Sequence, residues 1–144
     1  MGRTVSAVGV PMDLGADRRG VDMGPSAIRY GGLEAQIERV GHTFVDGGDL
    51  TVPRPAELAP DSAAVDGSAK YLDAVRAVCA DLADRVAAAR EDGVALVLGG
   101  DHSIAIGTAA GVADDRPTGL LWFDAHGDFN TPATTPSGTV HGMA

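Results

Sequence analysis

Five consecutive apolar residues, Val94 to Leu98, give the strongest indication of fold in this sequence. A strand with one face in water alternates apolar and polar side chains, whereas an unbroken apolar run is typical of a strand covered on both faces. Such strands belong to parallel sheets whose connecting helices pack on either side. The sequence therefore predicts an α/β fold.

The rest of the chain fits an alternation of strands and helices. Apolar residues recur at helical spacing over 68–90, and Pro25 and Gly41 suit the start and the end of a second helix. The predicted order is strand 5–10, helix 25–40, strand 42–45, loop 49–66, helix 68–90, strand 94–98, helix 104–113 and strand 119–123. This order favours a single domain of three α/β/α layers with a mainly parallel sheet.

Composition excludes several classes of function. The chain carries 11 Lys and Arg against 20 Asp and Glu, a net charge of -9, so it offers no basic surface for nucleic acid. It has neither a bilayer-length apolar run nor a signal-peptide core, which predicts no membrane partner. A lone cysteine, Cys79, fits a reducing cytoplasm. Cys79 and Trp122 both lie among apolar residues and are predicted to be buried.

The segment Asp124-Ala125-His126-Gly127-Asp128 follows the last predicted strand. Side chains alternate along an extended chain, so Asp124, His126 and Asp128 can face the same side. A divalent cation would neutralise the converging carboxylates, and mixed oxygen and nitrogen ligands suit Mn, Zn, Fe or Co. The alternative is a solvated acidic loop, or aspartates that cap a following helix.

A second motif, Gly99-Gly100-Asp101-His102-Ser103, follows the strand that ends at Leu98. Ligand sites of open α/β sheets form at the carboxyl ends of strands, and paired glycines allow a sharp turn there. Alone, His102 could be an ordinary hydrogen-bonded residue. Together with the Asp124 cluster it predicts four ligands from two strand ends, enough for two metals that share Asp124.

The last fifteen residues are rich in hydroxyl side chains and include one amide, Asn130. Asn130, Thr135 and Ser137 are neutral groups suited to holding a small polar substrate, and His141 could relay a proton. An ordinary polar loop remains the alternative for this segment.

The two motifs resemble the first two metal signatures of the ureohydrolases, the superfamily of arginase, agmatinase, guanidinobutyrase and formimidoylglutamase. The continuation from Phe129-Asn130-Thr131-Pro132 through Ser137-Gly138 to His141-Gly142 is similar to the arginase family in particular, as is the early segment from Gly20 to Pro25. The resemblance spans nearly the whole chain.

The resemblance implies an arginase-like fold and a binuclear manganese hydrolase that converts L-arginine and water to L-ornithine and urea through a metal-bridging hydroxide. It implies that His102, Asp124 and Asp128 hold one Mn²⁺, and that His126 and the shared Asp124 hold the other. Asp128 would also orient the hydroxide, and His141 would carry protons to the departing amine. By the same resemblance, Asn130, Thr135 and Ser137 bind the α-carboxylate of arginine.

Two departures from the family pattern matter. Thr139 stands where arginases often carry Asn, and the chain stops before the third signature, Asp-x-Asp, which supplies the remaining ligands. We therefore expect the chain to be the N-terminal portion of a single arginase-like domain, a partial sequence of a cytoplasmic homo-oligomer (trimer or hexamer) of arginine metabolism and the urea cycle. The alternatives are an agmatinase or guanidinobutyrase type of enzyme, or a non-catalytic remnant.

Overall fold

A computed structural model describes residues 2–59, 69–113 and 117–144. Its centre is a parallel sheet of three strands in the order β2-β1-β3, formed by Thr4–Val10 (β1), Thr43–Asp49 (β2) and Gly93–Gly99 (β3). The strand β1 is central, and Thr4 pairs with Thr43 on one side and with Gly93 on the other. The predicted parallel α/β sheet is confirmed.

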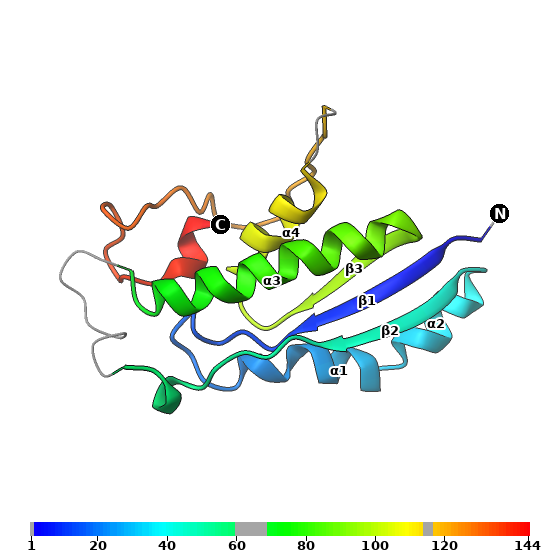
Figure 1. The fold of residues 1–144 in the computed structure, drawn as a ribbon, viewed down its shortest axis with the longest axis horizontal. Helices are drawn as coiled ribbons and strands as arrows, with labels where there is room; N and C mark the ends of the chain where they lie inside the picture. The colour runs from blue at the N-terminus through cyan, green and yellow to red at the C-terminus, as the bar shows by residue number, and fades with distance from the viewer. Residues whose placement is uncertain (1, 60–68, 114–116) are drawn as a thin grey trace.

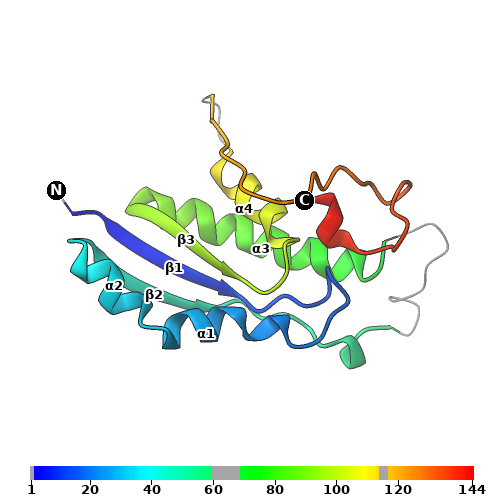
Figure 2. The same ribbon diagram turned by 180° about the vertical axis from the view of Figure 1, so that it is seen from behind.

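The strand order fixes where the helices lie. The chain passes from β1 to β2 through α1 (Gly24–Tyr30) and α2 (Leu33–Arg39), and from β2 back across to β3 through α3 (Leu72–Glu91). These two crossovers run in opposite directions along the sheet, so right-handed connections put their helices on opposite faces. Accordingly, α3 crosses in front of β1 and β3 in Figure 1 and behind them in Figure 2. The three predicted layers are confirmed.

The core lies between α3 and the sheet. The helix α3 presents Val75, Val78, Cys79, Leu82 and Val86 to it, all buried, and β1 contributes Val8 and Val10 from the opposite side. The burial of Cys79 confirms the expectation for this thiol. A further helix, α4 (Ile104–Val112), packs against α3.

Several element boundaries differ from the prediction. The helix expected over 25–40 is two helices, because Gly32 adopts a left-handed φ of 87° and the chain turns there. The strand expected over 42–45 runs on to Asp49. The loop expected over 49–66 includes a short helical turn at Pro55–Glu57, and its residues 60–66 lie outside the described part of the chain, as does Ser68.

The fourth strand expected over 119–123 is wrong. This segment is extended but joins no sheet, and Leu121 and Phe123 are 85% and 94% exposed. No other described strand lies beside it, so its backbone joins no sheet ladder. Trp122 is 40% exposed rather than buried in the core, for the same reason.

No helix within the described residues is both long enough and apolar enough to span a bilayer.

Candidate metal centre

The site forms where β1 and β3 end. Beyond the strands their pairing continues, because the Gly100 N–H donates to the Val10 carbonyl at 3.0 Å and the Asp101 N–H donates to the Met12 carbonyl at 2.8 Å. A Cβ on Gly100 would collide with the Met12 carbonyl, so the close approach of these two loops requires glycine. The loop then leads directly into α4 and places His102 at the edge of the sheet.

Asp101 anchors this loop. It is 7% exposed, and one carboxylate oxygen accepts the Ser103 N–H at 3.0 Å and the Ser103 hydroxyl at 2.6 Å. The other oxygen accepts the Ala16 N–H at 2.9 Å, which ties in the loop after β1. Asp101 is therefore satisfied by the protein and positions its neighbour His102. This role was not predicted from the sequence, although an Asp two residues before a Ser is typical of such a turn.

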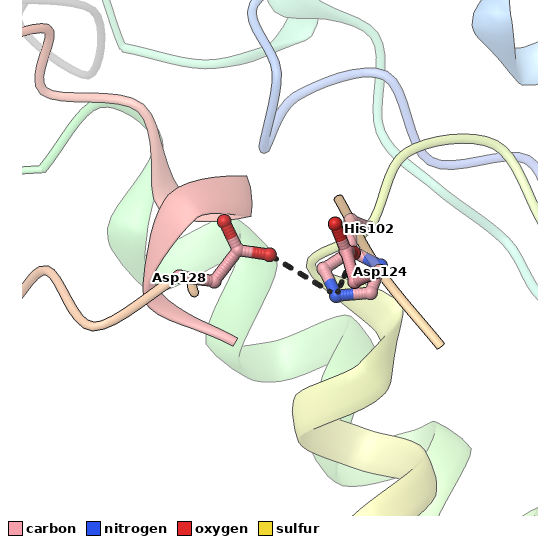
Figure 3. A group of neighbouring side chains, drawn as sticks. All are labelled: His102, Asp124 and Asp128. Atoms are coloured by element: carbon pink, nitrogen blue, oxygen red, sulfur yellow. Dashed lines mark ion pairs between the residues drawn. The ribbon is translucent and has the colours of Figure 1, made fainter. Parts of the chain in front are cut away.

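Three side chains meet in front of the loop (Figure 3). His102 Nε2 lies 3.5 Å from Asp124 Oδ2 and 3.4 Å from Asp128 Oδ2. The three ligand atoms all lie within 4.8 Å of one another. Asp128 adopts a left-handed φ of 49°, which turns the chain after Gly127. The structure thus brings together residues from both predicted motifs.

The geometry of this triad fits a divalent cation. His102 Nε2 is a buried atom that makes no hydrogen bond, although two carboxylates flank it. Ligand atoms about 2.1 Å from a first-row metal lie about 3.0 to 3.4 Å from one another, close to the distances seen here. One imidazole nitrogen and two carboxylate oxygens are also a donor set that such metals prefer.

Local hydrogen bonds favour the charged form of Asp124. Its Oδ1 accepts the backbone N–H of His126 at 2.8 Å, and this bond is the main reason that the pKa of Asp124 lies below its usual range. The nearby His102 and His126 rings lower the pKa further. The Trp122 ring meets His102 edge to face, with centroids 5.1 Å apart, and so restricts the imidazole from the side.

A pocket of about 420 Å³ opens around the triad. His126 lies on its wall with its side chain 80% exposed, and His126 Nδ1 is 3.3 Å from Asp124 Oδ1. His126 therefore touches the carboxylate predicted to be shared, on the oxygen that does not face His102. The other residues that line the pocket are Gly127, Asn130 and His141.

The predicted substrate residues divide into two groups. Asn130 lines the pocket, whereas Thr135 and Ser137 do not. The Thr135 hydroxyl accepts the Gly138 N–H at 3.1 Å, and Ser137 Oγ lies 2.6 Å from Thr139 Oγ1. In this structure both hydroxyls serve the turn of their own loop.

The end of the chain folds back onto the site. Val140 is 2% exposed in the core, and the Asn130 N–H donates to the Gly142 carbonyl at 3.1 Å. His141 donates its backbone N–H to the Gly15 carbonyl at 3.1 Å, and its ring Nδ1 lies 3.2 Å from the same oxygen. The predicted proton carrier is thus fixed beside the pocket by the loop after β1.

Comparison with known proteins agrees with this arrangement. A family model described as the Arginase family matches residues 3–144. The chain belongs to the arginase family. The arginase of Brevibacillus brevis is 52% identical over 145 residues, which cover 99% of this chain and 47% of that protein. The arginase of Bacillus subtilis is 48% identical, with the same coverage of each chain.

Solved arginase structures share the fold. The arginase of Bacillus caldovelox superposes with a TM-score of 0.85 at 48% identity, covering 98% of this chain and 47% of that one. An Entamoeba histolytica arginase in complex with L-ornithine gives a TM-score of 0.81 at 30% identity, covering 99% of this chain and 47% of that one. The chain spans about half the length of the curated arginases it matches.

Proposed function

We propose that this chain carries part of the active site of a metal-dependent hydrolase that converts L-arginine and water to L-ornithine and urea. The observation that carries the proposal is the triad of His102, Asp124 and Asp128 at the carboxyl ends of a parallel sheet, with a buried imidazole nitrogen that has no hydrogen-bond partner. In a chain of the arginase family, such a set of donors favours a catalytic cation over a structural one.

We further propose how the donors divide. His102, Asp124 and Asp128 would hold one cation, and His126 would hold a second together with the other oxygen of Asp124. Mn²⁺ suits this mixture of imidazole and carboxylate ligands. When bound, two divalent cations supply Lewis acidity and lower the pKa of water toward neutrality. The protein's own task is to hold these donors at the edge of the sheet, and the bonds of Asp101 do so for the loop that carries His102.

The remaining proposed roles concern the substrate. Asn130, Thr135 and Ser137 would bind the α-carboxylate of arginine, Asp128 would orient the attacking water, and His141 would deliver a proton to the departing amine. Support comes from Asn130 and His141, which line one pocket with the triad, and from the L-ornithine complex of the Entamoeba arginase. Thr135 and Ser137 would need to exchange their loop hydrogen bonds for bonds to substrate.

A substrate comparison tests the choice of arginine. For the protein that includes the Asp-x-Asp segment, urea release in the presence of Mn²⁺ should be measured from L-arginine and from agmatine, which lacks the α-carboxylate. We expect urea from arginine, and the Asn130→Ala variant should raise KM for arginine by about tenfold, the value of one charge-assisted hydrogen bond, without a similar change for agmatine. Urea from agmatine but not from arginine would instead identify an agmatinase type of enzyme.

We also propose that these residues form the N-terminal portion of a single arginase-like domain in a homo-oligomeric cytoplasmic enzyme of arginine metabolism. The 47% coverage of the curated arginases supports the first part. The test is the DNA that follows the codon for Ala144: an Asp-x-Asp segment in frame is expected, and a stop codon with no such segment nearby would contradict the proposal.

A further inference from the structure

In the loop after β1, Gly15 contacts both the loop that carries His102 and the ring of His141. Gly15 is buried, and its carbonyl oxygen is the acceptor for the backbone N–H of His141 at 3.1 Å and lies 3.2 Å from His141 Nδ1. On its other side Gly15 packs against Asp101 and Ser103, the residues that anchor the His102 loop. Gly15 thus lies between the candidate metal ligand and the candidate proton carrier.

The contact with Nδ1 determines the protonation pattern of the imidazole. A carbonyl oxygen can only accept a hydrogen bond, so His141 Nδ1 must carry a proton to make this contact. In the neutral ring Nε2 then has no proton and is free to accept one. The backbone N–H of His141 donates to the same oxygen, so the main chain of His141 keeps the imidazole within reach of this carbonyl.

We propose that Gly15 is a positioning residue for proton transfer, which holds His141 in the Nδ1–H tautomer and leaves Nε2 as the nitrogen that exchanges protons in the pocket. The inference rests on the proposed role of His141 and adds which contact fixes the tautomer of its ring. It also explains why residue 15 is glycine: an added Cβ would collide with Ser103 Oγ and would lie 2.6 Å from Asp101 Oδ1. Any larger residue would push the carbonyl away from His141.

The tautomer can be measured directly, with no metal and no substrate. Long-range ¹H–¹⁵N correlation spectra of the 144-residue chain with ¹⁵N-labelled histidine distinguish the Nδ1–H ring from the Nε2–H ring, and His141→Gln assigns the signal. We expect a single Nδ1–H tautomer in the wild type at a pH where the ring is neutral. A dominant Nε2–H tautomer, or rapid averaging of the two, would overturn the proposal.

Two glycine variants complete the test. Gly15→Ala should lose the single-tautomer pattern of His141, whereas Gly119→Ala makes the same chemical change where nothing lies within 4 Å and should keep it. An unchanged tautomer in folded Gly15→Ala would contradict the proposal. If Gly15→Ala does not fold, the wild-type spectrum still decides. A fixed Nδ1–H tautomer, with no urea released by a protein that also contains the Asp-x-Asp segment, would leave this inference standing and count against the proposed function alone.

Discussion

Asp101 and Asp124 belong to one site but differ in role: Asp101 anchors a loop, and Asp124 is a candidate metal ligand. Asp101 is buried and accepts three hydrogen bonds from the protein, whereas Asp124 keeps one oxygen directed at His102. Burial without a counter-ion is tolerable for Asp101 because its acceptor positions are satisfied. The carboxylates of Asp124 and Asp128 both approach His102, and a cation would offset the repulsion between their negative charges.

Asp101→Asn should therefore weaken metal binding although Asp101 is not a ligand. The amide oxygen of Asn can replace only one of the two carboxylate oxygens, so its NH₂ group would face either the Ser103 donors or the Ala16 N–H, and the His102 loop would lose an anchor. The affinity for Mn²⁺ should fall by about 10 to 100-fold, as when other groups that orient a ligand are removed, and calorimetric titration measures it. The exposed Asp81→Asn on α3 is the matched control. Equal affinities for all three proteins would contradict this role.

The carboxylate of Asp46, away from the site, makes the stability of the protein depend on pH. Bidentate bonds from Arg29, both 2.9 Å, lower the pKa of Asp46 below its usual range, and the Gly48 N–H adds to the effect. A depressed folded-state pKa stabilises the protein above the unfolded pKa of about 3.9, and that contribution is lost as the pH falls through the folded value.

Asp46→Asn should consequently cost about 0.5 to 1 kcal/mol of unfolding free energy at pH 7, a modest value because the pair is partly exposed. The difference from wild type should shrink below pH 4. Urea denaturation at both pH values measures it. A difference that stays constant with pH would exclude the ion pair as its source.

At the residue scale, the sequence predicts the candidate metal ligands but not the residues that position them. His102, Asp124 and Asp128 are recognisable because each motif is a local pattern next to an apolar run. Asp101 and Gly15 act through the backbone of residues that are distant in sequence, as in the bond from Ala16 to Asp101. The local pattern of Asp101 indicates only its turn with Ser103, and neither residue's pattern specifies a partner distant in sequence, so these long-range contacts are found only in the fold.

At the scale of elements, α4 depends on glycine for its contact with α3. A Cβ on Gly107 would lie 2.5 Å from the Cys79 carbonyl, and one on Gly111 would lie 2.5 Å from the Ala83 carbonyl. The two helices therefore approach closely enough that backbone meets backbone. Because α4 begins directly after Ser103, this contact also supports the loop that carries His102.

Gly107→Ala should destabilise the protein by about 1 to 3 kcal/mol, the usual cost of overpacking. The sign is informative, because in an unobstructed helix the same change stabilises by up to about 1 kcal/mol. Thermal and urea unfolding measure the change, with the unobstructed Gly119→Ala as control. Stabilisation by Gly107→Ala would contradict the close packing of α3 and α4.

Elements were predictable where their signal is contained within them. The helical spacing of Val75, Val78 and Leu82 identifies α3, and the apolar run identifies β3. The segment 119–123 has an equally apolar sequence, yet it forms no strand, because a strand also needs a neighbour to receive its hydrogen bonds. The apolar pattern of a segment does not show whether a neighbouring strand is present.

At the scale of the whole molecule, exposed apolar residues flank the segment 124–128 in the sequence. Leu121, Phe123 and Phe129 are each at least 85% exposed, and β3 has no strand on its outer side within the described residues. Contiguous apolar surface and open sheet edges both promote association.

We expect the 144-residue chain to self-associate as its concentration rises, and the double variant Leu121→Lys/Phe123→Lys to reduce this. Glu34→Lys, at an exposed site on α2, changes the net charge from -9 to -7 just as the double variant does, and it should leave association unchanged. Sedimentation velocity measures all three proteins. Equal reduction by both variants would attribute the effect to charge rather than to the apolar surface.

The binding of Mn²⁺ tests the proposed centre most directly. Electron paramagnetic resonance follows the loss of the free Mn²⁺ signal as protein is added, and it needs neither substrate nor turnover. We predict saturable uptake by the wild-type chain, unchanged uptake by Asp81→Asn, and a loss of at least about tenfold in affinity for Asp128→Asn. Absence of saturable uptake by the wild type, or uptake that Asp128→Asn leaves unchanged, would contradict the assignment of His102, Asp124 and Asp128 as a metal centre.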